Sequence, residues 1–534
     1  MWIENTLIKQ YDQTSLKNGS KVIFEMYILS LDVGTSSMRG IIYDERGKLI
    51  YSCQEHYKVE YKPPNIVKQD PLTWKRALYN VLNCISEYVK QQNIDLEAIC
   101  VTSQRASVIP VDRENQPLYD AIMWQDKRSY KQCSDINKII SSEELYKKTG
   151  LVLDPYFSLP KMIWLKQEKP EIYKKTYKLI GVQDYIIFLL TNKYVTDWTQ
   201  ASRTMLMNIS NFKWDDSIID QVGLDKSLLP ELCPPGSIVG QMSEEVSKLT
   251  NLKTGIPVII SGGDQQCAAI ALNVIKPGIV EVNTGTGSFI IMYSDKPIFD
   301  KNNTRTLCSA AAIPGKWIVE AGVLTTGSIY GWVKEQFYKD DENFVQINKE
   351  VEQAPVGSDG VVMLPHFEGS AAPYWNPLAT GLIFNLTLGT KRASIARSAL
   401  EGITLELAEN IKLLEQVTEA EIHTVTIAGG LTKFDVFNEI QADAFNKQVV
   451  KFKNSEATSF GAAISAMVTL GIYASYEIAL QKIQKEKDKI TYTPNMENVE
   501  KYKKIAWRKN ELYKALDDKN IYRTLQNDIQ LIHS

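Results

Sequence analysis

Paired cysteines, clustered histidines and long apolar runs are scarce in this chain of 534 residues. Its seven cysteines are scattered and form no Cys-x-x-Cys pair, which argues for reduced thiols in a cytoplasmic protein and against a disulfide framework. Its four histidines are dispersed, so a histidine-based metal site is not expected. The longest apolar runs, such as YIIFLL at 185–190, are far short of a membrane span. The polar N-terminus lacks the apolar core of a secretory signal.

An excess of charge of one sign is also absent. The formal net charge is −3 and 23% of the residues are charged, so we expect neither nucleic acid nor a membrane surface as a partner. The hydrophobic content of 44% is ordinary for a globular protein. At roughly 100–200 residues per domain, the length predicts two or more domains with substantial cores.

Apolar segments that end in small or acidic residues predict a mixed α/β chain. We expect strands at 27–33, 40–44, 48–57, 96–103, 107–112, 257–264, 278–295 (two strands around a turn) and 424–431, a helix that begins at Asp70-Pro71, further helices at about 433–446, 458–471 and 496–517, and a mostly helical stretch at about 130–250. The pattern of strand, Gly/Thr turn and strand at 27–44 recurs at 278–295. This recurrence predicts two related domains, each built on a mixed sheet, with a cleft between them.

The first turn, DVGTSSMR at 32–39, has the chemistry of an anion site. Gly34, Thr35, Ser36 and Ser37 can turn backbone N–H groups and hydroxyls toward a phosphate, and Arg39 adds a charged donor. Asp32 at the end of the strand can hold Mg²⁺ directly or through water. The same residues also fit a plain hairpin with an Asp-initiated turn.

Three later turns carry similar residues. GTGS at 285–288 lies between two strands, which makes it a second phosphate hairpin or an ordinary tight turn. In GGDQQ at 262–266, Asp264 can accept a hydroxyl proton as a general base, or it can cap the following helix. AGGL at 428–431 removes side-chain bulk and lets a flat base approach the backbone. None of these turns is a Walker A loop or a GxGxxG unit.

The order of these segments resembles the FGGY carbohydrate kinases, over roughly residues 27–515. The resemblance rests on LDVGTSSMR, TSQR at 102–105, IMWQDKR at 122–128, GGDQQ, NTGTGSF, LEGITLELAENI at 400–411 and AGGL. It implies the two-domain actin/hexokinase/Hsp70-like ATPase fold, an α/β (ribonuclease H-like) architecture with a cleft between the domains. We expect an N-terminal extension at 1–25, an N-terminal domain at 26–272 with the sugar or polyol site, and a C-terminal domain at 273–534 with the nucleotide site.

Within the family, LYDAIMWQDKR, TGLVLDPYFSLPK, VTDWTQASRTMLMNI, GDQQ and APYWNP are most similar to segments of glycerol kinases. The resemblance implies that Asp264 is the catalytic base and that Asp32 and Asp264 lie near Mg²⁺. It implies ATP contacts from Thr35, Ser36, Arg39, Thr286, Gly327, Gly430, Leu431 and Asp435, and a polyol site lined by Arg105, Trp124, Tyr156, Asp264, Gln265 and Phe289. These polar groups can bond vicinal hydroxyls while the aromatic rings pack the carbon chain, as a site for a small polar ligand needs.

The chain departs from the glycerol kinase pattern at two positions. Ala106 stands where a glutamate that grips glycerol is expected. The loss of a charged hydrogen-bond partner costs about 1.5–3 kcal/mol. Asn385 stands where the second family signature has glycine, which affects a local bend.

We therefore expect an ATP- and Mg²⁺-dependent kinase that phosphorylates a primary hydroxyl of a small polyol or sugar. Glycerol is not assumed as the acceptor, because the space at Ala106 suits a larger polyol or ketose. A pentulose, a tetritol and autoinducer-2 are the alternatives. A non-catalytic sugar or nucleotide sensor on the same fold is the alternative from another class, and a homo-oligomer, with a dimer favoured, is the expected assembly.

Overall fold

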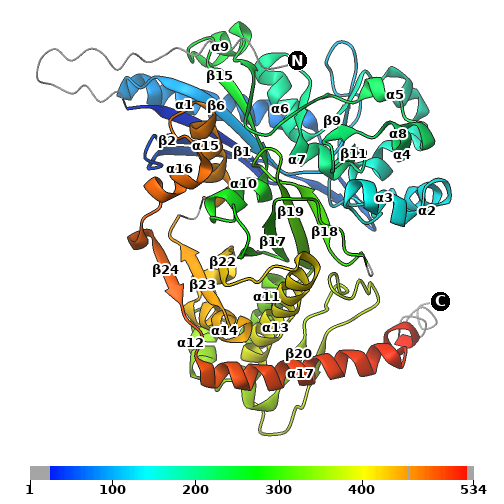
Figure 1. Cartoon of the computed structure of the whole chain (residues 1–534), viewed down its shortest axis with the longest axis vertical. Coiled ribbons are helices and arrows are strands. Elements are labelled where there is room, and N and C mark those ends of the chain that lie inside the picture. The colour runs from blue at the N-terminus through cyan, green and yellow to red at the C-terminus, as the bar shows by residue number, and fades with distance from the viewer. Residues whose placement is uncertain (1–24, 302–303, 455, 526–534) are drawn as a thin grey trace, which may run out of the picture.

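The computed structural model describes residues 25–301, 304–454 and 456–525, so the expected extension 1–25 lies almost wholly outside the described residues. Two large β-sheets with helices on their faces dominate the molecule, one in the upper and one in the lower half of Figure 1, and the described residues also form five sheets of two or three strands. The expected α/β class is therefore confirmed. Among the described residues, no helix has both the length and the apolar character that a bilayer span requires.

The first sheet has six strands in the order β14-β15-β6-β1-β2-β3. They are β1 Tyr27–Val33, β2 Ser37–Asp44, β3 Leu49–His56, β6 Leu96–Ser103, β14 Ser237–Gln241 and β15 Pro257–Gly263. Strand β1 runs antiparallel to β2 and parallel to β6, and β6 runs parallel to β15. The parallel strands are buried, as their continuous apolar runs indicate.

The second sheet has seven strands in the order β18-β19-β17-β16-β22-β23-β24. They are β16 Ile279–Thr284, β17 Ser288–Ser294, β18 Leu307–Ala310, β19 Trp317–Val323, β22 Thr424–Ala428, β23 Gln448–Phe452 and β24 Lys489–Tyr492. Strand β16 runs antiparallel to β17 and parallel to β22, which runs parallel to β23. The predicted recurrence is confirmed, because each sheet has a central strand between a hairpin partner and two parallel strands. Strands β18 and β19 were not predicted.

Long helices cover the outer faces of both sheets. On the first sheet, α1 Pro71–Gln92 begins as predicted, because the Asp70 side chain accepts a hydrogen bond from the Leu72 N–H and Pro71 fills the first helical position. Trp74, Leu78 and Leu82 of this helix are fully buried in the core of that sheet. The other covering helices include α6 Val182–Thr191 and α9 Glu244–Thr250 on the first sheet, and α11 Gly327–Phe337, α12 Val345–Gln353, α13 Arg392–Thr418, α14 Asp435–Phe445 and α17 Met496–Asp518 in the second half.

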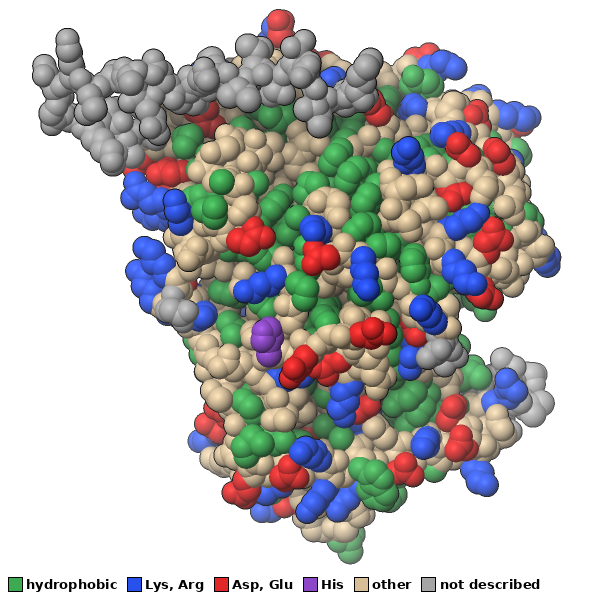
Figure 2. All heavy atoms as spheres, in the orientation of Figure 1, with side chains coloured by type: hydrophobic (Ala, Val, Ile, Leu, Met, Phe, Trp, Pro, Cys, Tyr) green, Lys and Arg blue, Asp and Glu red, His purple; other side chains and the backbone are tan. Residues whose placement is uncertain are grey.

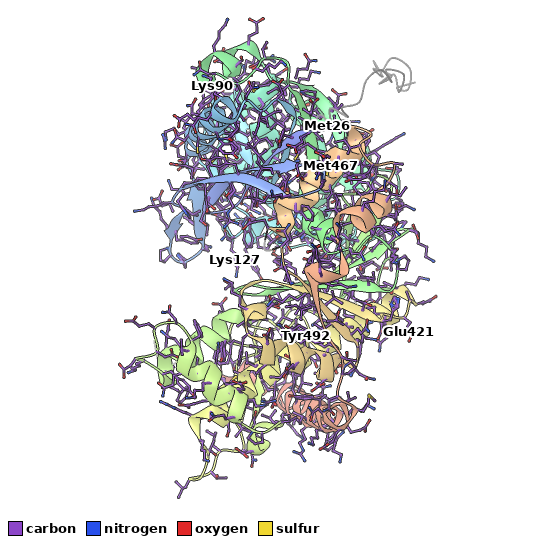
Figure 3. All side chains as sticks on the ribbon, turned by 90° about the vertical axis from the view of Figure 1, so that its left-hand side faces the viewer. Met26, Lys90, Lys127, Glu421, Met467 and Tyr492 are labelled. Carbon is purple, nitrogen blue, oxygen red and sulfur yellow. The ribbon has the colours of Figure 1, made fainter. Side chains whose placement is uncertain are left out.

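Two helices lie between the sheets, namely α10 Asp264–Ala271 and α15 Ala457–Thr469. Helix α15 lies between β23 and β24 of the second sheet in sequence, yet it packs on β1, β6 and β15 of the first sheet. Figure 3 accordingly shows Met467 of α15 in the upper half, near Met26, while Tyr492 and Glu421 lie in the lower half. A Cβ atom on Gly461 would lie only 1.8 Å from the Cys267 carbonyl oxygen, so this glycine lets the two helices touch backbone to backbone. The chain after residue 456 thus helps to build the first half, and a division at residue 272 stays a prediction.

The expected helical stretch at 130–250 contains short strands as well as helices. Its helices besides α6 and α9 are α2 Tyr130–Ile139, α3 Ser142–Thr149, α4 Ser158–Glu168, α5 Pro170–Lys175, α7 Trp198–Ala201 and α8 Asp216–Gln221. Its short strands are β9 Lys178–Ile180, β10 Val195–Asp197, β11 Met207–Asn208, β12 Lys213–Trp214 and β13 Glu231–Cys233. The remaining elements are β4 Glu60–Lys62, β5 Ile66–Gln69, β7 Ile109–Val111, β8 Ala121–Ile122, β20 Val362–Leu364, β21 Leu382–Phe384 and α16 Tyr476–Ile483.

Candidate active site

Two carboxylates lie at one edge of the first sheet. Asp32 is the second-last residue of β1, and its register partner in β6 is Thr102, which pairs in turn with Gly262 of β15. Asp264 follows directly after β15. Because β1, β6 and β15 are parallel, their carboxyl ends meet at this edge and bring Asp32 and Asp264 together. Polar residues outside the carboxyl ends of parallel strands are a common basis for ligand sites.

Burial opposes ionisation of both carboxyl groups. Burial raises the pKa of Asp32 to about 7, and the Asp264 carboxylate adds to this rise while Arg39 opposes it. Burial also raises the pKa of Asp264, against the pull of Arg105. A cation between these groups would relieve both effects, since an opposite charge favours the ionised form.

Asp264 is the first residue of α10, and Gly263 occupies the N-cap position. The alternative prediction that Asp264 caps this helix is therefore wrong. Its Oδ1 atom accepts a hydrogen bond of 2.7 Å from the Gln265 N–H and lies 3.3 Å from Nε of Arg105. The Asp264 side chain is 27% exposed, whereas that of Arg105 is 2% exposed. The carboxylate thus faces solvent from a fixed position while the arginine lies behind it.

A buried charge network supports Arg105. Its Nη1 atom lies 3.7 Å from Oε2 of Glu320 in β19, and Oε1 of Glu320 accepts a hydrogen bond of 2.8 Å from Nη1 of Arg203. Burial would raise the pKa of Glu320, but the two arginines hold that pKa below its usual range. Glu281 of β16 lies in the same charged region, and burial raises its pKa to about 8. The network joins residues of the first half to the second sheet directly behind Asp264.

An aromatic wall stands beside the first turn. Nε1 of Trp124 donates a hydrogen bond of 3.1 Å to Oγ1 of Thr35, and the rings of Trp124 and Tyr156 lie 5.4 Å apart at 63°. The buried ammonium group of Lys161 donates to the carbonyl oxygens of Pro155, Tyr156 and Phe157 and so fixes the backbone that carries Tyr156. The structure therefore brings the predicted polyol residues Trp124 and Tyr156 together with the predicted phosphate residue Thr35.

Gln265 and Phe289 meet through Asn283. Nδ2 of Asn283 donates a hydrogen bond of 3.4 Å to Oε1 of Gln265, and Asn283 pairs with Phe289 across the β16–β17 hairpin. Phe289 is half-buried. These contacts bring a third aromatic residue and the second sheet toward the α10 end of the site.

The predicted nucleotide residues of the second sheet form one group. The Gly327 N–H donates a hydrogen bond of 3.0 Å to the Gly285 carbonyl, and the Thr326 N–H donates one of 2.8 Å to the Thr286 carbonyl. A Cβ atom on Gly327 would lie 2.4 Å from the Gly285 oxygen and 3.9 Å from Cγ of Leu431. The exposed Gly430 has open space beside it. This arrangement leaves bare backbone at the ends of β16 and β22, which suits a flat ligand group.

The remaining predicted nucleotide residues lie at either end of this region. Arg39 makes an ion pair of 2.7 Å with Glu456 at the start of α15, so it is occupied by a protein carboxylate. Ser36 is exposed at the first turn. Asp435 begins α14 and accepts a hydrogen bond of 2.6 Å from the Tyr492 hydroxyl. Within the described residues, no hydrogen bond or ion pair joins the first turn to the second.

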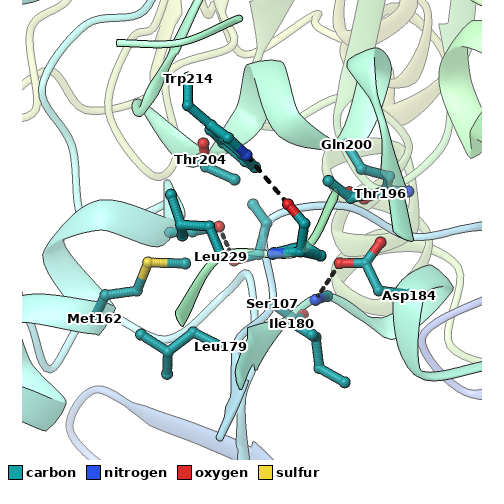
Figure 4. A pocket seen from close by; sticks show the side chains of 14 residues that line it. Ser107, Met162, Leu179, Ile180, Asp184, Thr196, Gln200, Thr204, Trp214 and Leu229 are labelled. Carbon is teal, nitrogen blue, oxygen red and sulfur yellow. Dashed lines mark hydrogen bonds between the residues drawn. The ribbon is translucent and has the colours of Figure 1, made fainter. Parts of the chain in front are cut away.

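The two departures from the family pattern have distinct structural settings. Asn385 has a φ of 68°, the left-handed conformation that glycine favours and asparagine tolerates, so it keeps the backbone bend expected of a glycine. Ala106 also has a positive φ, of 65°, and is buried. Beside it lies a cavity of about 20 Å³, walled by Met162, Leu179 and Trp214 among others (Figure 4). This volume suits about one water molecule, and none of the predicted polyol residues lines it.

Sequence reasoning missed Glu281, Glu320, Arg203 and Lys161. Glu281 and Glu320 do give a signal in the sequence, because each is a single acid inside a mostly apolar strand, IVEVNT and WIVEAGV. Burying an unpaired charge costs free energy, so such an acid is expected to have a partner or a role in a site. Arg203 and Lys161 sit in mixed sequence and give no such signal. Among the described residues, no group of three or more His, Cys, Asp or Glu side chains could enclose a metal ion.

Known proteins that this chain resembles in sequence and in structure are carbohydrate kinases. The N-terminal domain model of the FGGY family of carbohydrate kinases matches residues 27–271, and the C-terminal domain model matches residues 280–470. A glycerol kinase from Thermococcus gammatolerans is 33% identical over 472 residues, which cover 86% of this chain and 93% of that protein. A gluconate kinase structure from Lactobacillus acidophilus superposes with a TM-score of 0.85 at 26% identity, covering 92% of this chain and 98% of the other. The structure of Plasmodium falciparum glycerol kinase with ADP gives a TM-score of 0.84 at 28% identity, covering 92% and 98%.

Proposed function

The chain belongs to the FGGY family of carbohydrate kinases and is a sugar or polyol kinase, and we propose that it transfers the γ-phosphoryl group of ATP to a primary hydroxyl of its acceptor. The observation that carries this proposal is the position of Asp264. Its carboxylate is fixed by Arg105 and the Gln265 N–H, it is partly exposed, and it faces a second carboxylate, Asp32. Proton abstraction by such a group activates the hydroxyl for attack on phosphorus.

The acceptor would bind between the aromatic wall and the charge network. Arg105 and Gln265 can donate hydrogen bonds to vicinal hydroxyls, and Trp124, Tyr156 and Phe289 can pack against the carbon chain. The acceptor hydroxyl would then lie at Asp264, which takes its proton. Phosphates would lie over the two turns that hold Thr35, Ser36 and Arg39 on one side and Thr286 and Gly327 on the other. Closure of the two halves would exclude water, which otherwise competes as acceptor.

The residues present fit Mg²⁺. Two carboxylates whose ionisation is opposed lie close together, and Mg²⁺ in phosphoryl-transfer sites is held by one or two carboxylates, water and substrate phosphates. No all-protein cage is needed, which agrees with the lack of a three-ligand cluster in the described part of the chain. We propose Asp32 and Asp264 as the groups that hold it, where it would neutralise the charge on the phosphates.

The proposal for the acceptor rests on Ala106. The missing carboxylate removes a hydrogen-bond partner for glycerol, and we propose a larger acceptor, such as a tetritol, a pentulose or autoinducer-2. The support is the lost partner and not the space, because the cavity beside Ala106 is small and lies apart from the polyol residues.

The experiment is ADP release with Mg-ATP and a panel of glycerol, erythritol, threitol, ribitol, xylitol, xylulose, ribulose and autoinducer-2. Turnover of a larger acceptor at least tenfold above that of glycerol supports the proposal, and preferred use of glycerol overturns the acceptor assignment but leaves the kinase reaction. Ala106→Glu is the matched variant, and it should raise kcat/KM for glycerol roughly 10-fold or more, since a regained charged hydrogen bond is worth about 1.5–3 kcal/mol. Silence across the panel with ATP still bound would favour a non-catalytic sensor.

A further inference from the structure

A second cavity of about 540 Å³ lies outside the candidate active site and shares none of its predicted residues. Its walls come from both halves of the molecule: the β2–β3 turn at 46–48, the end of α10, the segment from the end of β23 into α15, and the segment after α16. This volume is within the usual range for a small-molecule pocket, about 300–1,000 Å³.

The lining of this cavity is strongly basic. Five cationic residues line it together with a single described acid, Asp488; they are Arg46, Lys48, Lys482, Lys485 and Lys487. Within the described part of the chain, the ammonium groups of the four lysines have no hydrogen-bond or ion-pair partner, whereas Arg46 lies 3.2 Å from Glu45. Figure 2 shows Lys and Arg side chains gathered at the left edge of the molecule, beside α16. The concentration of positive charge is local, because the whole chain has a net charge of −3.

The neighbouring groups favour a compact anion. Asp488 is already engaged, since its Oδ2 atom accepts a hydrogen bond of 3.1 Å from the Lys485 N–H. Ala457 is the first residue of α15, whose N-terminus adds a partial positive charge at the cavity. Phe452 and Phe460 give the cavity an apolar wall. Unpaired lysines around a concave pocket attract phosphate groups as point charges.

We propose that this cavity binds a small molecule with two or more phosphate groups, at a site separate from catalysis. A bound anion would contact residues of both halves, so its occupancy depends on how the halves sit. The site adds to the proposed kinase function and does not depend on it, because its binding can be measured without turnover.

The test is titration calorimetry of the full chain with tripolyphosphate at fixed free Mg²⁺, with saturating Mg-ADP to occupy the catalytic turns. The cavity variant is Lys482→Ala/Lys485→Ala/Lys487→Ala. The matched control is Lys138→Ala/Lys174→Ala/Lys248→Ala, three lysines at least 69% exposed elsewhere in the first half. We expect wild type and control to bind one tripolyphosphate, and the cavity variant to bind at least tenfold more weakly.

Affinity should also fall as salt rises from 50 to 200 mM, because the attraction is screened. Titrations with GDP and with pyrophosphate in place of tripolyphosphate separate two sources of the phosphate groups. Tenfold tighter binding of GDP than of pyrophosphate assigns a nucleotide as the ligand. Equal affinity for the two shows that the cavity recognises the phosphate groups alone. No binding to ADP-saturated wild type, or equal affinity in the cavity and control variants, would overturn the proposal. Lys48→Ala provides a second cavity variant that removes only one exposed side chain.

Discussion

The two strand–turn–strand units share a backbone plan but differ in chemistry. Asp32 stands two residues before the first glycine of its turn and pairs across the hairpin with Arg39. Asn283 stands at the corresponding place in the second unit and pairs with Phe289. The first unit thus presents two charges where the second presents an amide and a ring. The two turns thus share a strand–turn–strand plan, but of these two residue pairs only the one at the first turn carries charge.

The second turn is instead shaped by close backbone contacts. Gly327 and Gly287 each lie where a Cβ atom would come within 2.5 Å of a backbone oxygen, of Gly285 and Leu324 respectively. Burial raises the pKa of Glu281, a buried acid four residues before this turn, to about 8. The first turn therefore supplies charge to the site, whereas close backbone contacts give the second turn its shape.

The largest effect should come from the charge of the first sheet. Asp264→Asn removes the proposed base at nearly constant volume, and we expect kcat to fall about 10²- to 10⁴-fold, the usual contribution of general-base catalysis. Steady-state ADP release measures it. Glu281→Gln is the matched control, a buried acid of the second sheet, and should keep kcat within about threefold. Equal losses in the two variants would show that charge on both sheets serves catalysis.

Glu281 itself should report on stability through pH. Its pKa is raised by burial from 4.5 to about 8, so between these values the folded state binds more protons than the unfolded state. Stability should therefore fall as pH rises from about 4.5 to 8, by at most about 1.4 kcal/mol per pH unit from this group. Glu281→Gln removes this dependence, and the variant should gain most over wild type at pH 8.

The measurement is the apparent unfolding midpoint in urea at pH 5, 6.5 and 8 for both proteins. Midpoints that stay parallel across this range would show that Glu281 is ionised in the folded state, and that it adds a second charge to that of Glu320 in the same sheet.

Much of the fold could be predicted because the informative segments are continuous. The buried strand 96–103 and the Asp70-Pro71 helix start are local patterns, and the structure has both at those positions. Strands β18 and β19 were not predicted, because their place in the sheet depends on tertiary pairing: β19 lies between β17 and β18, and β18 forms the edge. The packing of α15 on the first sheet is a contact over more than 400 residues, as in the hydrogen bond from Ser30 to the Ser459 carbonyl, and no periodicity encodes it.

Some residues of the candidate site could likewise be predicted from the sequence, and others could not. Asp32 and Asp264 could be proposed because each acid stands at the end of an apolar strand beside a glycine-rich turn, and the resemblance to the FGGY kinases implies that both lie near Mg²⁺. Glu320 and Arg203 act on Arg105 only through tertiary contact, so their place behind the site needed the structure. The ion pair of Arg39 with Glu456 likewise joins residues 417 positions apart, so the sequence alone does not show it.

The shape of the second turn can be tested with glycine substitutions. Gly327→Ala puts a methyl group 2.4 Å from the Gly285 oxygen, a backbone atom that cannot rotate away. We expect the turn to shift and KM for ATP to rise about tenfold, a cost of roughly 1.4 kcal/mol. Gly331→Ala in the same helix has no atom within 4 Å and should leave KM unchanged while adding about 0.5–1 kcal/mol of stability. An unchanged KM in Gly327→Ala would mean that ATP does not depend on the shape of this turn.

The smallest effect concerns Arg39 of the first turn, whose charge is paired with Glu456. The Arg39–Glu456 pair is 40% and 25% exposed at the two side chains, so breaking it costs at most about 1 kcal/mol. Glu456→Gln should free Arg39 for phosphate and lower KM for ATP about two- to fivefold, and it also removes a carboxylate that raises the pKa of Asp32. Arg39→Ala should shift KM in the opposite direction. If Glu456→Gln raises KM instead, Glu456 orients Arg39 toward ATP. The charge of the first turn then depends on a residue that lies between β23 and β24 in the sequence.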